Sequence, residues 1–297
     1  MLETRQTNRF ALLFFLYFIG VTLGLAFFPP FYSLSYAEQS MLDYVLAFLP
    51  PICFYFLFTK KSPRETLRLK PLGWKNLILV VLLSFAVKPL MAFFSYFSQL
   101  FFPNPVEASS GAIYSSSFLP MLFTIAVLPA VFEELVMRGI VLSGYRSFGT
   151  LKASLATGFL FAMLHLSPQQ FLYAFCVGAL FCVLVQRTGS IFSSMIPHFL
   201  INAETVIGIF SAGTETSAAV SPPATILFIY VSIFALLSLP VLAGLLYLFF
   251  KVNPLPAESA TPLAEKGTLP KARFFTPSTL LLCVVYILLG ILPELFS

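Results

Sequence analysis

Charged residues are scarce in this chain of 297 residues: Asp, Glu, Lys and Arg make up only 10% of it, whereas 59% of its residues are hydrophobic. A typical soluble domain is about 25% charged and about 45–50% apolar. The mean hydropathy of +0.93 is too high for a globule that must cover its surface with polar groups. The composition therefore excludes a soluble enzyme and a disordered chain, and we expect an integral membrane protein.

Cysteine is also rare. The four cysteines lie inside hydrophobic runs, and no two of them form a CxxC pair: Cys53, Cys176, Cys182 and Cys283. A disulfide framework or a thiolate metal site would need another spacing and placement of the cysteines. We therefore predict that these side chains serve as small buried hydrophobic groups.

Long hydrophobic runs, in contrast, recur along the whole chain. About 20 helical residues cross the hydrocarbon core of a bilayer, and nine segments come near that length: 10–28, 41–58, 77–102, 118–146, 153–166, 169–186, 191–210, 224–250 and 278–296. The predicted fold is all-α, a single integral membrane domain over residues 1–297 with about eight or nine transmembrane spans. The apolar stretch of the first segment is about 19 residues, which favours a retained signal-anchor over a cleaved signal peptide.

The cations follow one rule of placement. If nine segments alternate across the membrane, all 17 Lys and Arg residues except Lys88 and Arg138 fall on the same side. The positive-inside rule makes that side cytoplasmic. We expect a plasma-membrane protein with a cytoplasmic N-terminus and an external C-terminus. The net charge of +5 reflects this topology, so the expected partner is the lipid bilayer and not nucleic acid.

Ionisable and amide side chains inside the spans are exceptions that gather on three segments. They are Glu133, Glu134 and Arg138 on the fourth segment, His165 on the fifth, and His198 and Asn202 on the seventh. A rise of about 1.5 Å per residue from the nearest cytoplasmic cation places the glutamates, histidines and Asn202 about 16–22 Å deep. Ionisable groups within membranes mark functional sites. We therefore predict one shared site, somewhat to the cytoplasmic side of the midplane.

Helical spacing assigns different roles to neighbouring residues. Glu134 and Arg138 are four residues apart and can form an ion pair on one helix face. Glu133 is rotated by about 100° from Glu134 and is left free to face a cavity. His198 and Asn202 are also four residues apart, so both can point toward one target.

Three further features surround this set. Phe161 precedes His165 by one turn and should form a wall beside it. Glu204 lies on another face of its helix than the predicted site, and we expect it to pair with Lys88. Pro129 removes the helical hydrogen bond to the carbonyl of Ile125, a defect that membranes tolerate where a polar cavity satisfies the freed group.

Common proteolytic motifs are absent. The sequence contains no GxSxG nucleophile elbow and no HExxH metal motif. Asp43 is the only aspartate, which excludes an aspartyl dyad. Two histidines, two adjacent glutamates and an asparagine remain to carry chemistry.

These residues allow two schemes. In the first, Glu133 takes a proton from water that attacks an amide carbonyl, and Asn202 with a histidine stabilises the oxyanion. In the second, Glu133 and the two histidines, His165 and His198, hold Zn²⁺ with an open fourth position. Glu134 would then be the base. Spacing alone leaves both schemes open.

Three motifs in a fixed order carry a family resemblance. The segment Glu133–Arg138 reads EExxxR, Phe161–His165 reads FxxxH, and His198–Asn202 reads HxxxN. On successive membrane segments, this set resembles the CPBP family of intramembrane proteases, which includes type II CAAX prenyl endopeptidases and bacteriocin-processing and immunity-associated proteins. The resemblance covers residues 118–210, the expected catalytic core.

The resemblance implies a helical membrane core with a cavity open to the cytoplasm. It implies a metallo- or glutamate-type peptidase in which Glu133 activates water, with His165, His198 and Asn202 completing the site, and with Glu134 and Arg138 bracing it. The metal, if present, would be Zn²⁺.

The leading hypothesis is an endopeptidase that cleaves near the cytoplasmic side of the bilayer. Its substrate would be a peptide or a membrane-anchored protein, lipidated tails included. Two alternatives stay open. Buried Glu, His and Arg also build the proton relays of coupled transporters, and the family scaffold could serve as a catalytically silent immunity or binding protein.

Overall fold

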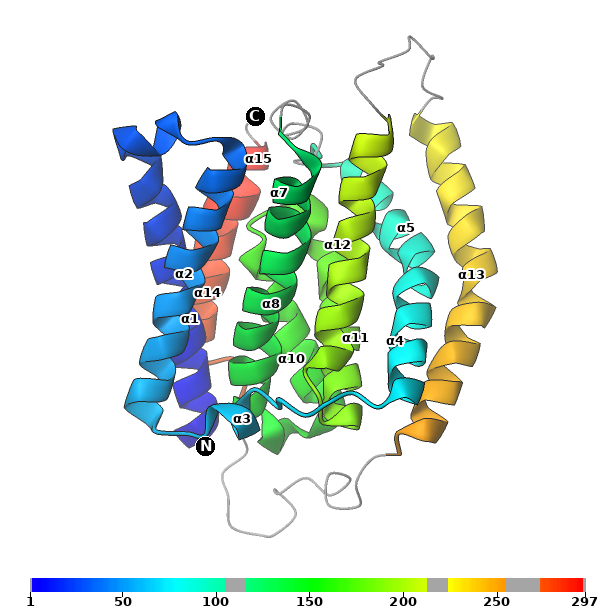
Figure 1. The fold of residues 1–297 in the computed structure, drawn as a ribbon, viewed down its shortest axis with the longest axis horizontal. Helices are drawn as coiled ribbons and strands as arrows, with labels where there is room; N and C mark the ends of the chain where they lie inside the picture. Colours follow the sequence, from blue (N-terminus) through cyan, green and yellow to red (C-terminus); the bar gives the residue numbers. More distant parts are fainter. Residues whose placement is uncertain (1, 105–115, 213–223, 255–272, 296–297) are drawn as a thin grey trace.

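The computed structural model describes residues 2–104, 116–212, 224–254 and 273–295. Over these residues the chain is a bundle of helices without a strand (Figure 1). The all-α, polytopic fold expected from the sequence is confirmed. The long elements, in chain order, are α1 (Leu2–Ala26), α2 (Tyr36–Thr59), α4 (Trp74–Ala86), α5 (Lys88–Gln99), α7 (Phe118–Leu122), η2 (Phe123–Val127), α8 (Leu128–Glu134), η3 (Leu135–Val141), α9 (Leu142–Gly144), α10 (Gly149–Leu164), α11 (Pro168–Thr188), α12 (Phe192–Ala212), α13 (Ala224–Val252), α14 (Pro277–Tyr286), η7 (Ile287–Ile291) and α15 (Leu292–Leu295). Short helical turns occupy η1 (Pro29–Ser33), α3 (Pro63–Thr66) and η4 (Arg146–Phe148).

Eight helical stretches in the described part of the chain are long and apolar enough to cross a membrane. They correspond to eight of the nine segments expected from the sequence. The ninth, α12, spans 21 residues but is not in this set, because His198, Asn202 and Glu204 lower its mean hydropathy. It nevertheless runs through the bundle in contact with α4, α8 and α11 (Figure 1).

Proline and glycine explain where helices break. The segment expected as one helix over 77–102 is divided at Val87, because Pro89 in the first turn of α5 has no N–H to continue the hydrogen-bond ladder. Gly189 ends α11 in the left-handed conformation, with φ of +67°. Lys88, next to the first break, pairs with Glu204 of α12 as predicted.

The α10–α11 hairpin is the most closely packed pair of helices. Gly158 lies so close to α11 that a Cβ there would stand 2.7 Å from the backbone nitrogen of Ala179. Facing it, a Cβ on Gly178 would stand 2.8 Å from the ring of Phe161. These small residues thus allow the backbones of α10 and α11 to approach closely, as is common between helices in membranes.

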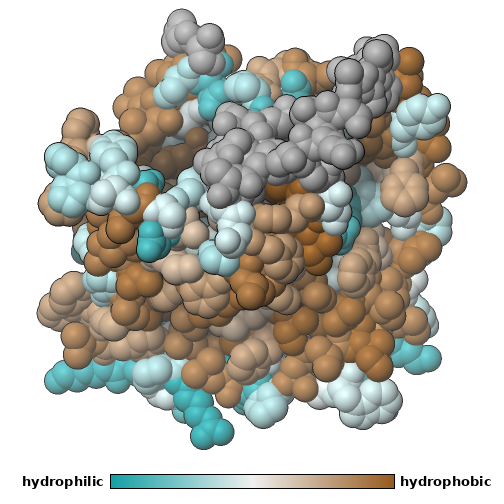
Figure 2. Space-filling view, turned by 45° about the horizontal axis from the view of Figure 1, so that its top comes forward, coloured by the Kyte–Doolittle hydropathy of each residue, from teal (hydrophilic) through white to brown (hydrophobic). Residues whose placement is uncertain are grey.

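Two hydrophobic clusters meet at α11. One joins α1, α2, the α8–α9 segment, α10 and α14, and the other joins α4, α5, α12 and α13. Hydrophobic side chains cover the sides of the bundle, as expected for contact with lipid (Figure 2). Many of the large hydrophobic side chains of α1, α2 and α13 are exposed there.

All described Lys and Arg residues except Lys88 and Arg138 belong to one end of the bundle, the lower end in Figure 1, which we call the cationic end. Hydrogen bonds tie its segments together: the Ile191 amide donates to the carbonyl of Arg68, and Arg187 donates to the carbonyl of Asn253. Burial, with the positive charge of Arg146, lowers the pKa of Arg68 to about 10, so Arg68 is charged at neutral pH. The start of α2 and the ends of α5, α10 and α12 lie toward the other end, here called the opposite end.

Candidate active site

Glu134 is the centre of a fully buried charge network. One of its oxygens, Oε1, accepts hydrogen bonds from Arg138 Nη1 at 2.8 Å and from His198 Nδ1 at 2.8 Å. Arg138 also donates to the carbonyl of Gly178, and its guanidinium lies 4.2 Å above the ring of Phe161. The predicted pair on one helix face is therefore confirmed. The network reaches further than predicted, because it also holds a histidine of α12.

The bond to Glu134 orients the imidazole of His198. A carboxylate can only accept, so Nδ1 carries the proton and Nε2 is directed elsewhere. Nε2 lies 3.9 Å from Oε2 of Glu133. A carboxylate that fixes the tautomer of a functional histidine is a common device in metal sites and in general-base sites.

Glu133 faces the cavity, as its rotation from Glu134 predicts. Its Oε1 accepts a hydrogen bond from the hydroxyl of Tyr44 at 3.0 Å. Its Oε2 is buried and has no hydrogen-bond partner among the described residues. Only 8% of Glu133 is exposed. Glu133 thus lines the cavity and keeps one buried oxygen without a hydrogen-bond partner among the described residues.

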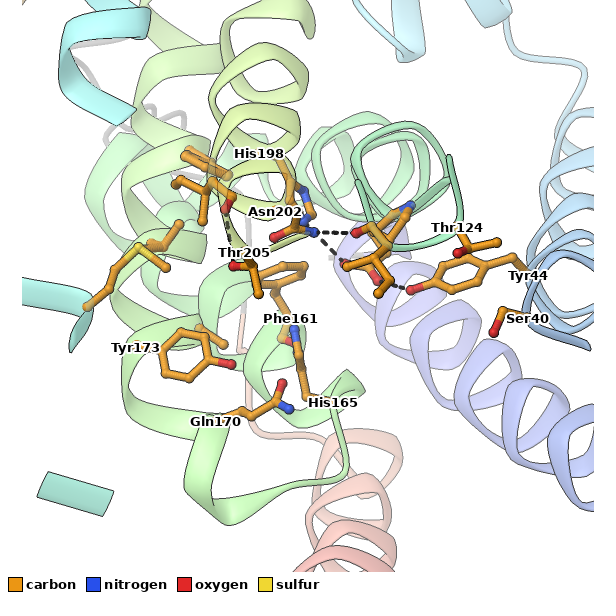
Figure 3. A pocket seen from close by; sticks show the side chains of 18 of the residues that line it. Ser40, Tyr44, Thr124, Phe161, His165, Gln170, Tyr173, His198, Asn202 and Thr205 are labelled. Atoms are coloured by element: carbon orange, nitrogen blue, oxygen red, sulfur yellow. Dashed lines mark hydrogen bonds and ion pairs between the residues drawn. The ribbon is translucent and has the colours of Figure 1, made fainter. Parts of the chain in front are cut away.

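His165 ends α10 and lies beside the same cavity. Its Nδ1 is 3.0 Å from the carbonyl of Phe161, which can only accept, so Nε2 is again the free nitrogen. The ring of Phe161 contacts both imidazoles edge-on, with centroid distances of 4.9 Å to His165 and 5.9 Å to His198. Phe161 therefore forms a wall beside both histidines (Figure 3).

Asn202 satisfies the backbone defect made by Pro129. Its Nδ2 donates to the carbonyl of Ile125 at 3.0 Å, to which Pro129 has no N–H to donate in an α-helical register. An amide nitrogen has two hydrogens, so one of them is left for another acceptor. Asn202 thus has a structural contact that the sequence did not indicate.

The cavity joining these groups has a volume of about 420 Å³. Glu133, His165, His198 and Asn202 all line it, so the structure brings the four predicted site residues to one space. Tyr44 and Ser40 of α2 face His198 and Asn202 of α12 across it, and His165 lies with Gln170 at the α10–α11 turn (Figure 3).

The residues do not fit the predicted zinc set in this arrangement. In the part of the chain that the structure describes, no three His, Cys, Asp or Glu side chains are grouped closely enough to hold a metal ion. His198 lies 3.9 Å from Glu133, whereas the polar contact of His165 is with the carbonyl of Phe161 and not with Glu133 or His198. We therefore derive no catalytic step through a metal.

Tyr44 is the main functional candidate that sequence reasoning missed. It lies 89 residues before Glu133, on another span, and no motif in the sequence links the two residues. Tyr173 of α11 also lines the cavity. Tyrosines are common at membrane interfaces, so neither residue stood out from the 12 tyrosines of the chain.

Comparison with known families supports the resemblance carried by the motifs. Residues 115–203 match the family model described as type II CAAX prenyl endopeptidase Rce1-like. The matched segment contains all four predicted site residues. The predicted resemblance is thus confirmed for this part of the chain. No curated protein and no solved structure matches the chain.

Proposed function

We propose that the chain is an intramembrane endopeptidase in which Glu133 activates a water molecule for attack on a peptide bond. The observation that carries the proposal is the free oxygen Oε2 of Glu133, which is buried at the cavity wall 3.9 Å from Nε2 of His198. A carboxylate oxygen without a hydrogen-bond partner can take a proton from a water molecule that reaches it, and the imidazole of His198 is close enough to contact the same water. The family match supports peptide hydrolysis as the reaction class.

The proposed steps follow from the hydrogen bonds. Glu133 accepts a proton from water, and the hydroxide oxygen bonds to the carbonyl carbon of the substrate. The oxyanion accepts a hydrogen bond from the second N–H of Asn202. When the C–N bond breaks, the proton on Glu133 passes to the leaving amine. His198, whose imidazole is oriented by Glu134, positions the water molecule for its attack on the carbonyl carbon.

Arg138 has a supporting role in this scheme. It neutralises Glu134 in a part of the protein with no exposed surface. Without this cation, two adjacent carboxylates would lie together in a low-dielectric site, and one of them would take up a proton. The pair thus keeps Glu134 able to orient His198.

The scissile bond would lie in the half of the membrane nearer the cationic end. Glu133 precedes the end of α9 by 11 residues, about 16 Å along a helix, and follows the start of α7 by 15 residues. The proposed base is thus closer to the cationic end of its helical segment than to the opposite end. A peptide or membrane-anchored protein, prenylated or not, is the proposed substrate.

Replacing Glu133 tests the proposal most directly. Glu133→Gln keeps the volume and removes the base, so we expect cleavage of a peptide library by the purified protein to fall by at least about 100-fold. Glu65→Gln, an exposed carboxylate at the cationic end, is the matched control and should keep full activity. Both variants should elute as the wild type on gel filtration. Wild-type cleavage by Glu133→Gln would exclude this residue as the base.

The same preparation tests the metal alternative. The zinc content of the purified protein and its cleavage rate after treatment with a chelator are measured together. Cleavage that survives chelation supports the scheme derived above. Cleavage that stops and returns with added Zn²⁺ would instead favour a rearranged site in which His165 joins Glu133 and His198.

A further inference from the structure

The cavity around Glu133 extends along the bundle in one direction only. Its lining includes Tyr36, the first residue of α2, Gln170 in the first turn of α11, and Ile209 in the last turn of α12. All three positions lie toward the opposite end of the bundle, away from the cations (Figure 1). The cavity therefore reaches from the catalytic level to the opposite end.

The bundle is closed between the cavity and the cationic end. The lining residues nearest the cationic end are Glu133, Phe181 and His198. Beyond them, η3, α9, α11, α12 and the adjoining turns fill the space with side chains that are 0–2% exposed: Met137, Ile140, Val141, Leu142, Tyr145, Leu184, Val185, Ile191, Ser193 and Ser194. An interior packed to this extent leaves no path for water. Water must therefore approach Glu133 from the opposite end.

The walls of the cavity are mainly apolar, with hydroxyl and amide groups among the hydrophobic side chains, and they carry no Lys or Arg. Hydroxyl and amide groups line it from its mouth to the catalytic level: Tyr36, Ser40, Tyr44, Thr124, Gln170, Tyr173, Asn202 and Thr205. A substrate that ends in a free carboxylate would find no ion-pair partner there, whereas an uncharged internal segment would find hydrogen-bond partners along its backbone.

The positions of the Lys and Arg residues indicate which side of the membrane the open end of the cavity faces. The end that bears the cations faces the cytoplasm by the positive-inside rule, so the opposite end faces outward. We propose that the active site takes its substrate from the non-cytoplasmic side, and that the substrate is an uncharged internal segment of an exported or membrane-anchored protein. This proposal rests on the function proposed above. It differs from the cavity open to the cytoplasm that the family resemblance led us to expect.

Thiol labelling tests the side of access independently of catalysis. In a variant with Cys53, Cys176, Cys182 and Cys283 replaced by alanine, single cysteines are introduced. Ser40→Cys reports on the cavity, Ser33→Cys on the exposed surface of the opposite end, and Lys75→Cys on the exposed cationic end. A membrane-impermeant maleimide is added to right-side-out and to inverted membrane vesicles.

We expect Ser40→Cys and Ser33→Cys to react in right-side-out vesicles and Lys75→Cys only in inverted ones. Reaction of Ser40→Cys only in inverted vesicles would overturn the proposal. So would reversed labelling of the two surface reporters, or a Ser40→Cys thiol that reacts from neither side. The alanine background must elute as a single species on gel filtration before the labelling is read.

A cleavage assay in cells then separates this proposal from the proposed function. Two single-span reporters carry the same uncharged target segment, one on the external side of the span and one on the cytoplasmic side. We expect the wild type, but not Glu133→Gln, to cut the external reporter at least tenfold faster than the cytoplasmic one. Faster cutting of the cytoplasmic reporter would reject the side of access and keep the peptidase. If neither reporter were cut and the thiol labelling were as expected, the proposed peptidase activity would be rejected, and the proposed access from the non-cytoplasmic side would stand.

Discussion

At the scale of single residues, two adjacent glutamates do different work because a helix turns by about 100° between them. Glu134 points into the protein, where Arg138 and His198 both donate to it. Glu133 points into the cavity and keeps one oxygen without a partner among the described residues. A single motif thus supplies both a braced acid and a reactive one.

Tyr44 provides the first prediction at this scale. Its hydroxyl is the one described hydrogen-bond donor to the carboxylate of Glu133. Tyr44→Phe removes this bond to a charged group, worth roughly 1.5–3 kcal/mol, so we expect the turnover number to fall about 10- to 100-fold. The Michaelis constant should change little, because the ring and its packing against Phe48 stay in place.

The measurement is steady-state kinetics with a cleaved peptide, accompanied by a thermal unfolding curve. Tyr17→Phe is the control: this hydroxyl of α1 donates to the carbonyl of Leu46 of α2 at an exposed position, away from Glu133. A Tyr44→Phe enzyme with unchanged turnover, or one whose lost activity tracks a lower unfolding temperature, would speak against a positioning role.

At the scale of helices, a proline and an asparagine on different helices compensate each other. Pro129 has no N–H to donate to the carbonyl of Ile125, and Asn202 of α12 donates to it instead. Asn202→Ala should therefore destabilise the protein by about 1–3 kcal/mol, the cost of a buried unpaired carbonyl. In a Pro129→Ala background the helix can supply its own N–H, so the same substitution should cost less. Unfolding curves of the two single variants and the double variant measure this coupling, and equal costs in both backgrounds would contradict it.

The α10–α11 hairpin gives a second prediction for helices. A Cβ at Gly158 would lie 2.7 Å from a backbone nitrogen and 3.0 Å from a backbone oxygen of α11, and neither can move without the helix. We expect Gly158→Ala to lower the free energy of unfolding by about 1–3 kcal/mol. It should also reduce cleavage, because Phe161 and His165 lie on the next two turns of α10. Gly208→Ala is the matched control. A Cβ there meets nothing within 4 Å, so neither property should fall.

Whether a contact of the fold or of the site could be predicted from the sequence depends on how far apart its two residues lie along the chain. The Glu134–Arg138 pair and the shared depth of Glu133, His198 and Asn202 depend on helical spacing, which is written in the local sequence. The bonds of Tyr44 to Glu133 and of His198 to Glu134 join helices far apart in the chain, and their pairing depends on how the helices pack. The one-sided cavity depends on packing for the same reason, so composition and motifs could not indicate its direction.

At the scale of the whole molecule, the gathering of cations at one end of the bundle also creates a cavity lined by arginines. A cavity of about 380 Å³ at the cationic end lies between α1 and the start of α14 and is lined by Arg5, Arg9 and Arg273. The hydroxyl residues Thr4, Thr276 and Ser278 lie beside them. Within the described part of the chain, none of the three arginines pairs with a carboxylate, whereas the nearby Glu3 is engaged by Lys61 at 3.0 Å.

Unpaired arginines at a membrane surface attract anionic lipid headgroups, at about 1 kcal/mol for each cation. We therefore expect the wild type to unfold at a higher temperature in nanodiscs of phosphatidylglycerol than in nanodiscs of phosphatidylcholine. The difference should shrink as salt is added, because surface charges are screened over about 10 Å at 0.1 M ionic strength. Replacing Arg5, Arg9 and Arg273 together by glutamine should abolish most of it. Arg64→Gln, which removes an exposed cation outside this cavity, should leave it intact. If the triple variant kept the full difference between the two lipids, the stabilisation would arise from the diffuse charge of the cationic end and not from these three arginines.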